Sequence, residues 1–347
     1  MPRQTVIART LAIASLVAAS VVGVGCGSKD EVVKVGGPTQ TVTVALDWTP
    51  NTNHMGAYVA QQLGYYKQAG LNVKFLPYAN TPPETLVANG KADFGFSYQA
   101  GIAYARASGQ DVVQVMATVR KPQYAIGYKA DRTDIKSPKD LDGKVYAGFG
   151  LPDEKPGIEF VIKKDGGAGK FKVVTLNTSA YDAVYAGSAD FTLPSKTWEG
   201  VEGQVIDKPM KYFEYTDYGF PASYSTALIS SDAYLKANEQ AAKAFLAATV
   251  RGYEYAQQHP SEAAALLIKA NPHAFKNPKV VDQSAAMLSK ADYYGDPGTI
   301  GQIDGQVWTD YGQFLFANKL LVGPNGKPLA TEPDWSSYWT NKYLPKG

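Results

Sequence analysis

Cysteine and histidine are scarce in this sequence. It contains one cysteine, Cys26, and three histidines among 347 residues. A disulfide needs a second cysteine, and His54 lies far along the chain from the other two histidines, His259 and His273. The sequence therefore predicts no disulfide, no metal site and no cysteine nucleophile in the folded part of the chain.

Long apolar runs are also scarce. The one between Leu11 and about Val24 is shorter than the roughly 18 residues that a membrane-spanning helix needs. Arg3 and Arg9 precede it and small residues follow it, which is typical of a secretory signal and predicts cleavage after residue 25. The stretch Gly23 to Cys26 resembles the lipobox of bacterial lipoproteins, with Gly23 where Leu, Val or Ile is usual.

The position of the single cysteine in this stretch predicts lipidation of Cys26 after cleavage. The acyl chain would hold the protein at the extracytoplasmic face of the cell envelope, as its only attachment to the membrane. Residues 26–40 then form the anchor and a flexible linker.

The predicted mature chain has no excess of either charge. Without residues 1–25 it has 32 basic and 32 acidic residues, so nucleic acid is not an expected partner. The stretch GGAGK, residues 166–170, lacks the spacing of a phosphate-binding loop and is interpreted as a turn, and no Gly-x-Ser-x-Gly motif is present. Asp153 and Glu154 are interpreted as acids at a helix start.

Strand and helix patterns alternate from Thr41 onward. An alternating run at 41–48 leads into a helical pattern at 56–69, and further strand patterns are separated by short helices near 83–89 and from about 99. This rhythm predicts α/β lobes, each with a sheet covered by helices.

One segment of the sequence is repeated. Residues 80–94 and 177–191 match at Asn, Thr, Val, Gly, Ala, Asp and Phe in the same order and spacing. We interpret this as two similar lobes joined by two strand-like crossovers near 124–131 and 223–232. Predicted lobe 1 comprises residues 41–123 and 229–347, including a carboxy-terminal helical block packed on it, and lobe 2 comprises residues 124–228.

Two hinged lobes create a cleft where strand ends and helix amino termini meet. The loop from Asp47 to His54 follows the first strand and contains Trp48 and Asn51. Unpaired backbone N–H groups at such a place attract acceptor atoms of a ligand.

Several stretches together resemble one known family. They are LDWTPNTNHMGAYVAQQLGYYKQAGLNV, GKADFGFS, SPKDLDGKVYAGFG, WEGVEG, DYGFP and AFLAATVRGYEYAQQHPSEAA, and in this order they are similar to the NMT1/THI5-like group of ABC transporter solute-binding proteins. The resemblance runs from about residue 41 to 345. It implies a type II periplasmic-binding-protein fold and the capture of a small ring compound for import.

The same resemblance raises an enzyme alternative, because fungal members build a pyrimidine from pyridoxal phosphate and their own histidine. The position that matches the family's cofactor lysine is Ser97, and the position of the donor histidine is Gly101. PASYS, residues 221–225, replaces the Cys-rich iron motif. Without the lysine no Schiff base forms, so we expect no enzyme activity and no cofactor.

The candidate ligand-binding residues lie at predicted strand ends or beside the crossovers. Trp48 is the first choice for stacking on a flat ring, with structural burial as the alternative, and Glu199 resembles a family position that often binds ligand. His54 could instead cap a helix or pin the loop. The complete set is Asp47, Trp48, Asn51, His54, Tyr78, Ser97, Tyr98, Gln99, Phe149, Trp198, Glu199, Asp217, Tyr218 and Tyr224.

The sequence thus predicts a monomeric, lipid-anchored binding protein for a thiamine pyrimidine precursor of the formylaminopyrimidine or hydroxymethylpyrimidine type. Its expected partners are an ABC permease and the ATPase of that permease. Riboflavin is the first alternative ligand. Sulfonate, taurine or nitrate are disfavoured because Lys121 and Lys196 are the only cations near the candidate loops.

Overall fold

The structure is a computed structural model that describes residues 33–346. These residues belong to one unit, Val32–Gly347. The predicted signal sequence 1–25, the lipidation site Cys26 and the first part of the predicted linker lie outside the described residues. Within the described residues, no helix combines the length and the apolar character needed to cross a membrane.

The first sheet has five strands in the order β2-β1-β3-β10-β4. The interior strand β1 (Gln40–Ala45) pairs in parallel with β2 (Leu71–Leu76) and β3 (Phe94–Ser97). β10 (Thr226–Ser230) runs antiparallel between β3 and β4 (Val113–Val119). Apolar and polar residues alternate in β1 as the sequence predicts, and the apolar residues Val42 and Val44 are fully buried.

The second sheet repeats this arrangement with five strands in the order β7-β6-β8-β5-β9. β6 (Val145–Gly148) pairs in parallel with β7 (Lys172–Thr175) and β8 (Phe191–Thr192). β5 (Ile126–Lys129) runs antiparallel between β8 and β9 (Met210–Phe213).

The duplicated sequence occupies equivalent places in the two sheets. Asp93, just before β3, accepts a hydrogen bond at 2.7 Å from the backbone N–H of Thr43 in β1. Asp190, just before β8, accepts one at 2.8 Å from the backbone N–H of Val145 in β6. The repeated Ala-Asp-Phe therefore fixes the same pairing of a third strand with an interior strand in each half.

Short helices follow the strands in both halves of the fold. In the first they are η1 (Thr52–His54), α1 (Met55–Gln62), α2 (Tyr65–Gln68), α3 (Pro83–Ala88) and α4 (Gln99–Ala107). In the second they are η2 (Pro138–Leu141), α5 (Glu154–Lys164), η3 (Asn177–Ser179), α6 (Ala180–Ala186), α7 (Glu199–Val205) and η4 (Tyr215–Tyr218). The predicted helix 56–69 is two helices, because Gly64 adopts a left-handed φ of 74° that ends the first.

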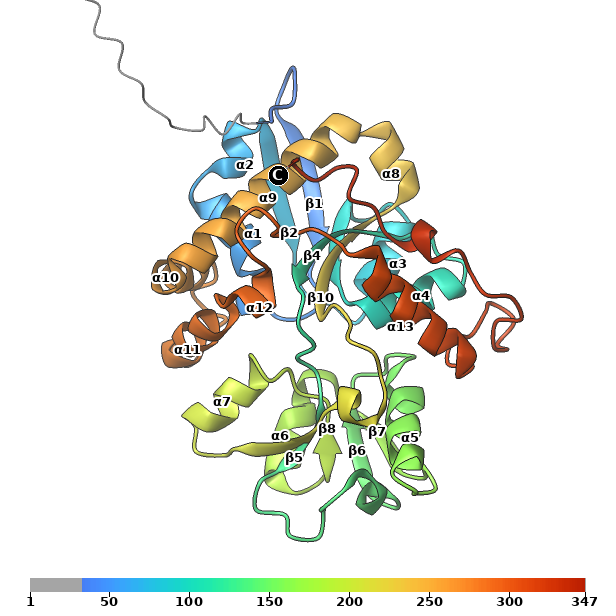
Figure 1. The fold of residues 1–347 in the computed structure, drawn as a ribbon. Helices are drawn as coiled ribbons and strands as arrows, with labels where there is room; N and C mark the ends of the chain where they lie inside the picture. The colour runs from blue at the N-terminus through green and yellow to red at the C-terminus, as the bar shows by residue number, and fades with distance from the viewer. Residues whose placement is uncertain (1–32, 347) are drawn as a thin grey trace, which may run out of the picture. The chain divides into compact units, whose positions relative to one another are not determined.

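A block of helices completes the chain after β10. It contains α8 (Asp232–Ala237), α9 (Glu239–Gln258), α10 (Pro260–Ala270), α11 (Pro278–Leu288), α12 (Ala291–Tyr294), α13 (Gly305–Ala317) and η5 (Trp335–Tyr338). In Figure 1, α9 lies beside α1 and α2 on one side of the first sheet, and α13 lies beside α3 and α4 on the other. The predicted packing of this block on the first sheet is confirmed.

The same block also contacts the second half of the chain, which the sequence did not predict. Ser284 of α11 donates a hydrogen bond to the backbone carbonyl of Thr197. Phe314 of α13 packs against Phe160 and Phe220, with ring centroids 5.1 and 4.5 Å apart. The helical block therefore joins elements of both sheets.

Two segments connect the sheets, residues 120–125 between β4 and β5 and residues 214–225 between β9 and β10. β10 belongs wholly to the first sheet, so the lobe boundary predicted between residues 228 and 229 runs through this strand. Gln123 stands where the segments meet and donates hydrogen bonds to Asn53 and Thr226. The division into lobes stays a prediction at its exact ends.

Candidate ligand-binding site

A cavity of about 230 Å³ is lined by residues from both sheets and from both connecting segments. The loops after β1, β3 and β6 and the amino-terminal ends of α4, α5 and α7 all contribute to it. Its walls include eight tyrosines and five acidic residues, and no Lys, Arg or His is among the lining residues described. The acids are Asp47, Glu84, Asp153, Glu154 and Glu199.

The loop after β1 is held by a short chain of hydrogen bonds. Asn51 caps η1 by accepting from the backbone N–H of Asn53 at 2.8 Å. The backbone N–H of Asn51 donates to Nδ1 of His54 at 3.3 Å, so Nε2 carries the ring proton and donates to Asp47 Oδ1 at 2.7 Å. His54 is fully buried, and it orients the Asp47 carboxylate toward the cavity.

Trp48 is the centre of an aromatic cluster in the cavity. Its ring centroid lies 5.1 Å from that of Tyr78, 5.4 Å from Phe149 and 6.3 Å from Tyr181. Trp48 and Tyr78 come from the first half of the fold, and Phe149 and Tyr181 from the second. We refer to these four residues as the aromatic cluster. Such an arrangement can hold a flat ring between its faces and edges.

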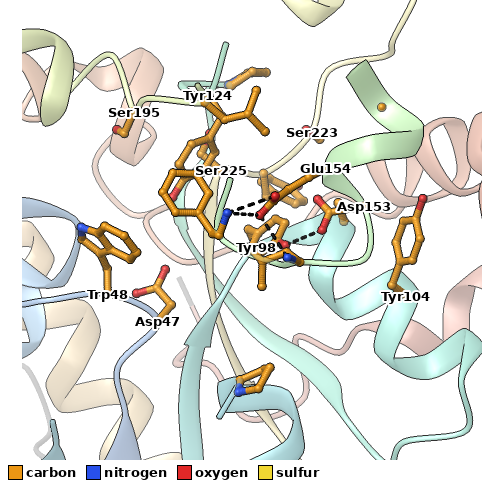
Figure 2. Close-up of a pocket in the computed structure, with 18 of the residues that line it drawn as sticks. Asp47, Trp48, Tyr98, Tyr104, Tyr124, Asp153, Glu154, Ser195, Ser223 and Ser225 are labelled. Carbon is orange, nitrogen blue, oxygen red and sulfur yellow. Dashed lines mark hydrogen bonds between the residues drawn. The ribbon is translucent and has the colours of Figure 1, made fainter. Parts of the chain in front are cut away.

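A second group of residues lies across the pocket from Trp48 and Asp47 (Figure 2). The Tyr98 hydroxyl donates to Asp153 Oδ1 at 2.7 Å, joining the start of α4 to the start of α5. Glu84 of α3 accepts a hydrogen bond from the Ser97 hydroxyl. Burial raises the pKa of Glu84 to about 7 and also raises the pKa of Asp153, because a carboxylate loses hydration there.

Two further carboxyls are held by backbone N–H groups. Glu154 accepts from Phe149 at 3.1 Å and from Leu151 at 3.0 Å, which fixes the loop after β6 (Figure 2). Glu199 accepts from the backbone N–H of Ser195 at 3.0 Å. Burial raises the pKa of Glu199 to about 8 despite this hydrogen bond.

Most of the predicted binding residues lie in the cavity wall. Trp198 is among them, and its outer edge also contacts the Phe275 ring at a centroid distance of 5.9 Å. A ligand-binding role stays a prediction for each of them. The predicted residues in the wall are Asp47, Trp48, Asn51, Tyr78, Tyr98, Phe149, Trp198, Glu199 and Tyr224.

Three predicted residues lie behind the wall. His54 is covered by Asp47 and by the Phe96 ring, 4.6 Å away between centroids. Ser97 is buried beneath Glu84. Gln99 donates to the carbonyl of Val307 and accepts from the backbone N–H of Tyr224. These side chains position residues of the wall, so their prediction as wall residues is corrected.

Asp217 and Tyr218 are also outside the wall, on η4. Asp217 is exposed, and the residues just before it, Tyr215 and Thr216, line the cavity instead. The segment reaches the cavity through residues that were not predicted from the sequence. The periodicity of a single 3₁₀ turn decides which of its side chains face inward, and sequence spacing did not reveal it.

Several residues of the wall were not predicted from the sequence. Asp153 and Glu154 were interpreted only as helix-start acids, and Glu84 and Tyr181 were not considered. The internal repeat contains a signal that could have found the first two. The loop after β6 is equivalent to the loop after β1, so its acids correspond in place to Asp47. No such rule predicts Glu84, because only the packing of α3 decides that its first turn faces the cavity.

Comparison with known proteins identifies the relatives of this chain. A family model described as NMT1/THI5 like matches residues 51–263. The formylaminopyrimidine-binding protein of Halalkalibacterium halodurans is 29% identical, over 86% of this chain and 90% of that protein. The 4-amino-5-hydroxymethyl-2-methylpyrimidine phosphate synthase of Legionella pneumophila is 26% identical, over 88% of this chain and 92% of the synthase.

Solved structures show the same fold. The periplasmic aliphatic sulphonate binding protein of Escherichia coli superposes with a TM-score of 0.62 at 16% identity, over 87% of this chain and 92% of that chain. At this identity the likeness concerns the fold alone. Together with the two sheets of matching strand order, it confirms the predicted periplasmic-binding-protein fold.

Proposed function

The chain belongs to the NMT1/THI5-like family, and from this premise we propose that it is the solute-binding component of an ABC importer for a thiamine pyrimidine precursor. The ligand would be of the formylaminopyrimidine or hydroxymethylpyrimidine type. A relative covering 86% of the chain is named a formylaminopyrimidine-binding protein. The observation that carries the proposal is the cavity itself, in which an aromatic cluster stands beside carboxyls and no basic side chain is present among the lining residues.

The chemistry of the wall suits an aminopyrimidine. A flat ring gains about 0.5–1.5 kcal/mol from offset stacking on aromatic neighbours beyond its buried area, and Trp48 offers such a face. Exocyclic amino groups are hydrogen-bond donors, and the wall offers the acceptor Asp47, which His54 orients. A hydrogen bond between an amine and a carboxylate is stronger than one between two neutral groups.

The same wall disfavours anions. A sulfonate, nitrate or phosphate group would have to leave water for a cavity whose lining residues include five acids and no Lys, Arg or His. Transfer of an anion toward uncompensated carboxylates is costly in a low-dielectric site. This supports the pyrimidine proposal over the sulfonate, taurine and nitrate alternatives.

Two features support binding rather than synthesis, although some relatives carry synthase names. Ser97, at the position that the family resemblance assigns to a cofactor lysine, is buried and donates to Glu84. At Gly101, assigned to a donor histidine, an added Cβ would lie 2.9 Å from Glu84 Oε1. The synthase product is a phosphate ester by name, and this cavity wall offers no cation to hold it.

The protein would also need a location outside the cytoplasm and a transport partner. We propose that the chain acts outside the cytoplasm, attached through a lipid on Cys26, and delivers its ligand to a permease driven by an ATPase. The names of its relatives and neighbours with binding functions support this role.

Tryptophan fluorescence tests the proposed ligand, because Trp48 and Trp198 both line the cavity. We expect a saturable change with formylaminopyrimidine, and a thermal stabilisation of about 2.7 kcal/mol when the ligand is at 100 times its Kd. Titrations with riboflavin and taurine distinguish the alternatives. Saturation by riboflavin alone would replace the pyrimidine proposal, and saturation by taurine alone would overturn the argument from charge.

A further inference from the structure

The cavity is larger than a single aromatic ring needs. Its volume of about 230 Å³ exceeds the engineered cavity of about 150 Å³ that accommodates benzene. The aromatic cluster occupies one region, and in Figure 2 Trp48 and Asp47 lie at one side of the pocket while Tyr98, Tyr104 and Asp153 lie at the other. A single pyrimidine beside Trp48 therefore leaves a second region of the cavity to be filled.

We call this second region the acid–tyrosine compartment and define it by Glu84, Tyr98, Tyr104, Asp153 and Tyr311, all of which line the cavity. The Tyr98 hydroxyl donates to Asp153, and the carboxyls of Asp153 and Glu84 are close enough to influence each other electrostatically. Burial raises the pKa of Tyr104 and of Tyr311, so both hydroxyls remain neutral donors or acceptors.

No positively charged side chain of the described lining balances the carboxyls of this compartment. Glu84 is 6% exposed and accepts from a serine hydroxyl, and Asp153 accepts from a tyrosine hydroxyl. Neither hydroxyl carries a positive charge, and the described lining contains no Lys, Arg or His. A buried carboxylate without a cationic partner is costly, and it is relieved either by a proton or by a cation that enters the site.

The tyrosines favour an entering cation, rather than a proton, as the partner of the buried carboxyls. Tyrosine rings attract a cation over their faces, and the attraction is stronger when water is excluded. Three tyrosines and two carboxyls around one space therefore match an ammonium or a charged heterocyclic nitrogen. They match a phosphate or a carboxylate poorly.

We propose that the acid–tyrosine compartment favours a positively charged substituent on the ring compound whose flat ring lies against the aromatic cluster. Among pyrimidines of the same size, a cationic one then binds more tightly than a neutral one. This inference rests on the proposed function, because it ranks by charge the pyrimidines that the same cavity captures.

A matched pair of pyrimidines tests the inference at one changed atom. 4-Amino-5-hydroxymethyl-2-methylpyrimidine is neutral in its side chain, and the 5-aminomethyl compound replaces the hydroxyl with a protonated amine of nearly equal size. Calorimetric titration of the purified protein near pH 8 should show at least tenfold tighter binding of the amine, since about 1.4 kcal/mol corresponds to a factor of ten.

Substitutions test which acids cause the preference for the amine. Asp153→Asn and Glu84→Gln keep the shape of each side chain and remove its charge, and each should lower the ratio of the two affinities, with the double variant bringing it close to one. Asp282→Asn, an exposed acid of α11 outside the cavity lining, is the matched control and should keep the wild-type ratio. Circular dichroism and the unfolding temperature show whether each variant is folded.

The wild-type protein offers a test that needs no substitution. Lowering the pH from about 8 to about 5.5 protonates Glu84, whose pKa is about 7, and should reduce the preference for the amine. Burial also raises the pKa values of Asp153, Glu154 and Glu199, so these acids contribute to the same change, and Asp47 is the remaining acid of the wall.

The outcomes separate the two proposals. Equal affinity for the two pyrimidines, or a preference that survives in the double variant, would overturn the cationic compartment while leaving pyrimidine capture intact. If neither compound binds and riboflavin or taurine does, the proposed function falls and this inference falls with it.

Discussion

At the scale of single residues, the candidate site depends on side chains that are supported by others behind them. His54 donates to Asp47, and Ser97 donates to Glu84. The predicted set mixed the wall residues with their supports, because both kinds are polar and follow the same strands. Sequence spacing brought them to the correct end of each sheet, and only the packing shows which side chain faces the cavity.

Trp48 gives the first prediction. Replacing it with Ala removes the centre of the aromatic cluster, so the Kd for formylaminopyrimidine should rise on the order of 10- to 100-fold through lost stacking and lost apolar contact. Calorimetric titration measures the change. Trp339→Phe, half-buried and outside the cavity lining, is the control and should leave the Kd unaltered. Unchanged affinity in Trp48→Ala would remove this residue from the proposed site.

Glu84 gives a prediction about stability and pH. Its pKa is about 7 in the folded protein against 4.5 as the usual value, so the folded state keeps a proton that the unfolded chain releases. The associated stability is complete below pH 4.5 and is lost as the pH rises through about 7. At one pKa unit per 1.36 kcal/mol, the loss is on the order of 3 kcal/mol at most.

Glu84→Gln should therefore unfold at a higher temperature than the wild type at pH 8.5 and at a similar temperature at pH 4.5. Thermal unfolding across this pH range is the measurement. Glu262→Gln, which changes an exposed carboxyl, should follow the wild-type curve. A Glu84→Gln curve parallel to the wild type would show that folding does not raise the pKa of Glu84.

At the scale of elements, the repeated strand-helix unit positions the site. The loops after β1 and β6 are equivalent in the two sheets, and they supply Trp48 and Asp47 from one half and Phe149 and Glu154 from the other. Each loop lies at the carboxyl end of an interior strand, where neighbouring strands also end. Duplication of one element order thus brings two similar loops to one cavity.

The contact between α1 and α9 gives a prediction at this scale. Gly252 of α9 faces Gly56 of α1 so closely that an added Cβ would lie 2.0 Å from the Gly56 carbonyl oxygen. Gly252→Ala would push the helices apart and should cost about 1–3 kcal/mol of unfolding free energy or more. Urea unfolding measures this change.

Gly36→Ala is the control for that substitution. An added Cβ there meets only the Gln240 side chain, at 3.9 Å, so we expect stability close to that of the wild type. An equal effect of the two substitutions would show that helix spacing is not what limits Gly252.

At the scale of the whole molecule, the helical block contacts elements of both sheets. Ser284 bonds to the Thr197 carbonyl, and Phe314 packs on Phe160 and Phe220. Ser284 also bonds to Thr52 in the loop after β1, and Phe220 itself lines the cavity, so these contacts connect the two halves that form the wall. The block is therefore part of what fixes the width of the cavity.

Attachment to the membrane gives the last prediction. Cys26→Ser in the full chain should move the protein from the membrane fraction to the soluble extracytoplasmic fraction of an expressing bacterium, because the lipid is expected to be its only anchor. Fractionation and labelling with a radioactive fatty acid measure the change. Retention of the variant in the membrane would mean that another segment holds the chain.

The sequence by itself determined the order of strands and helices, the duplication and the region of the site. Val42 and Val44 alternate with polar residues, Gly90 and Gly187 end equivalent helices, and the aromatic and acidic residues follow predicted strands. These features are local, so they can be deduced from residue type and spacing along the chain.

Only the tertiary structure decided which acids meet in the cavity. Glu84 and Asp153 are far apart in the chain and come from different halves of the fold, and their shared environment depends on how α3, α4 and α5 pack. The burial that raises their pKa values, and the absence of a basic neighbour among the lining residues, arise from that packing. Burial and charge pairing are properties of neighbours in space, which spacing along a chain does not specify.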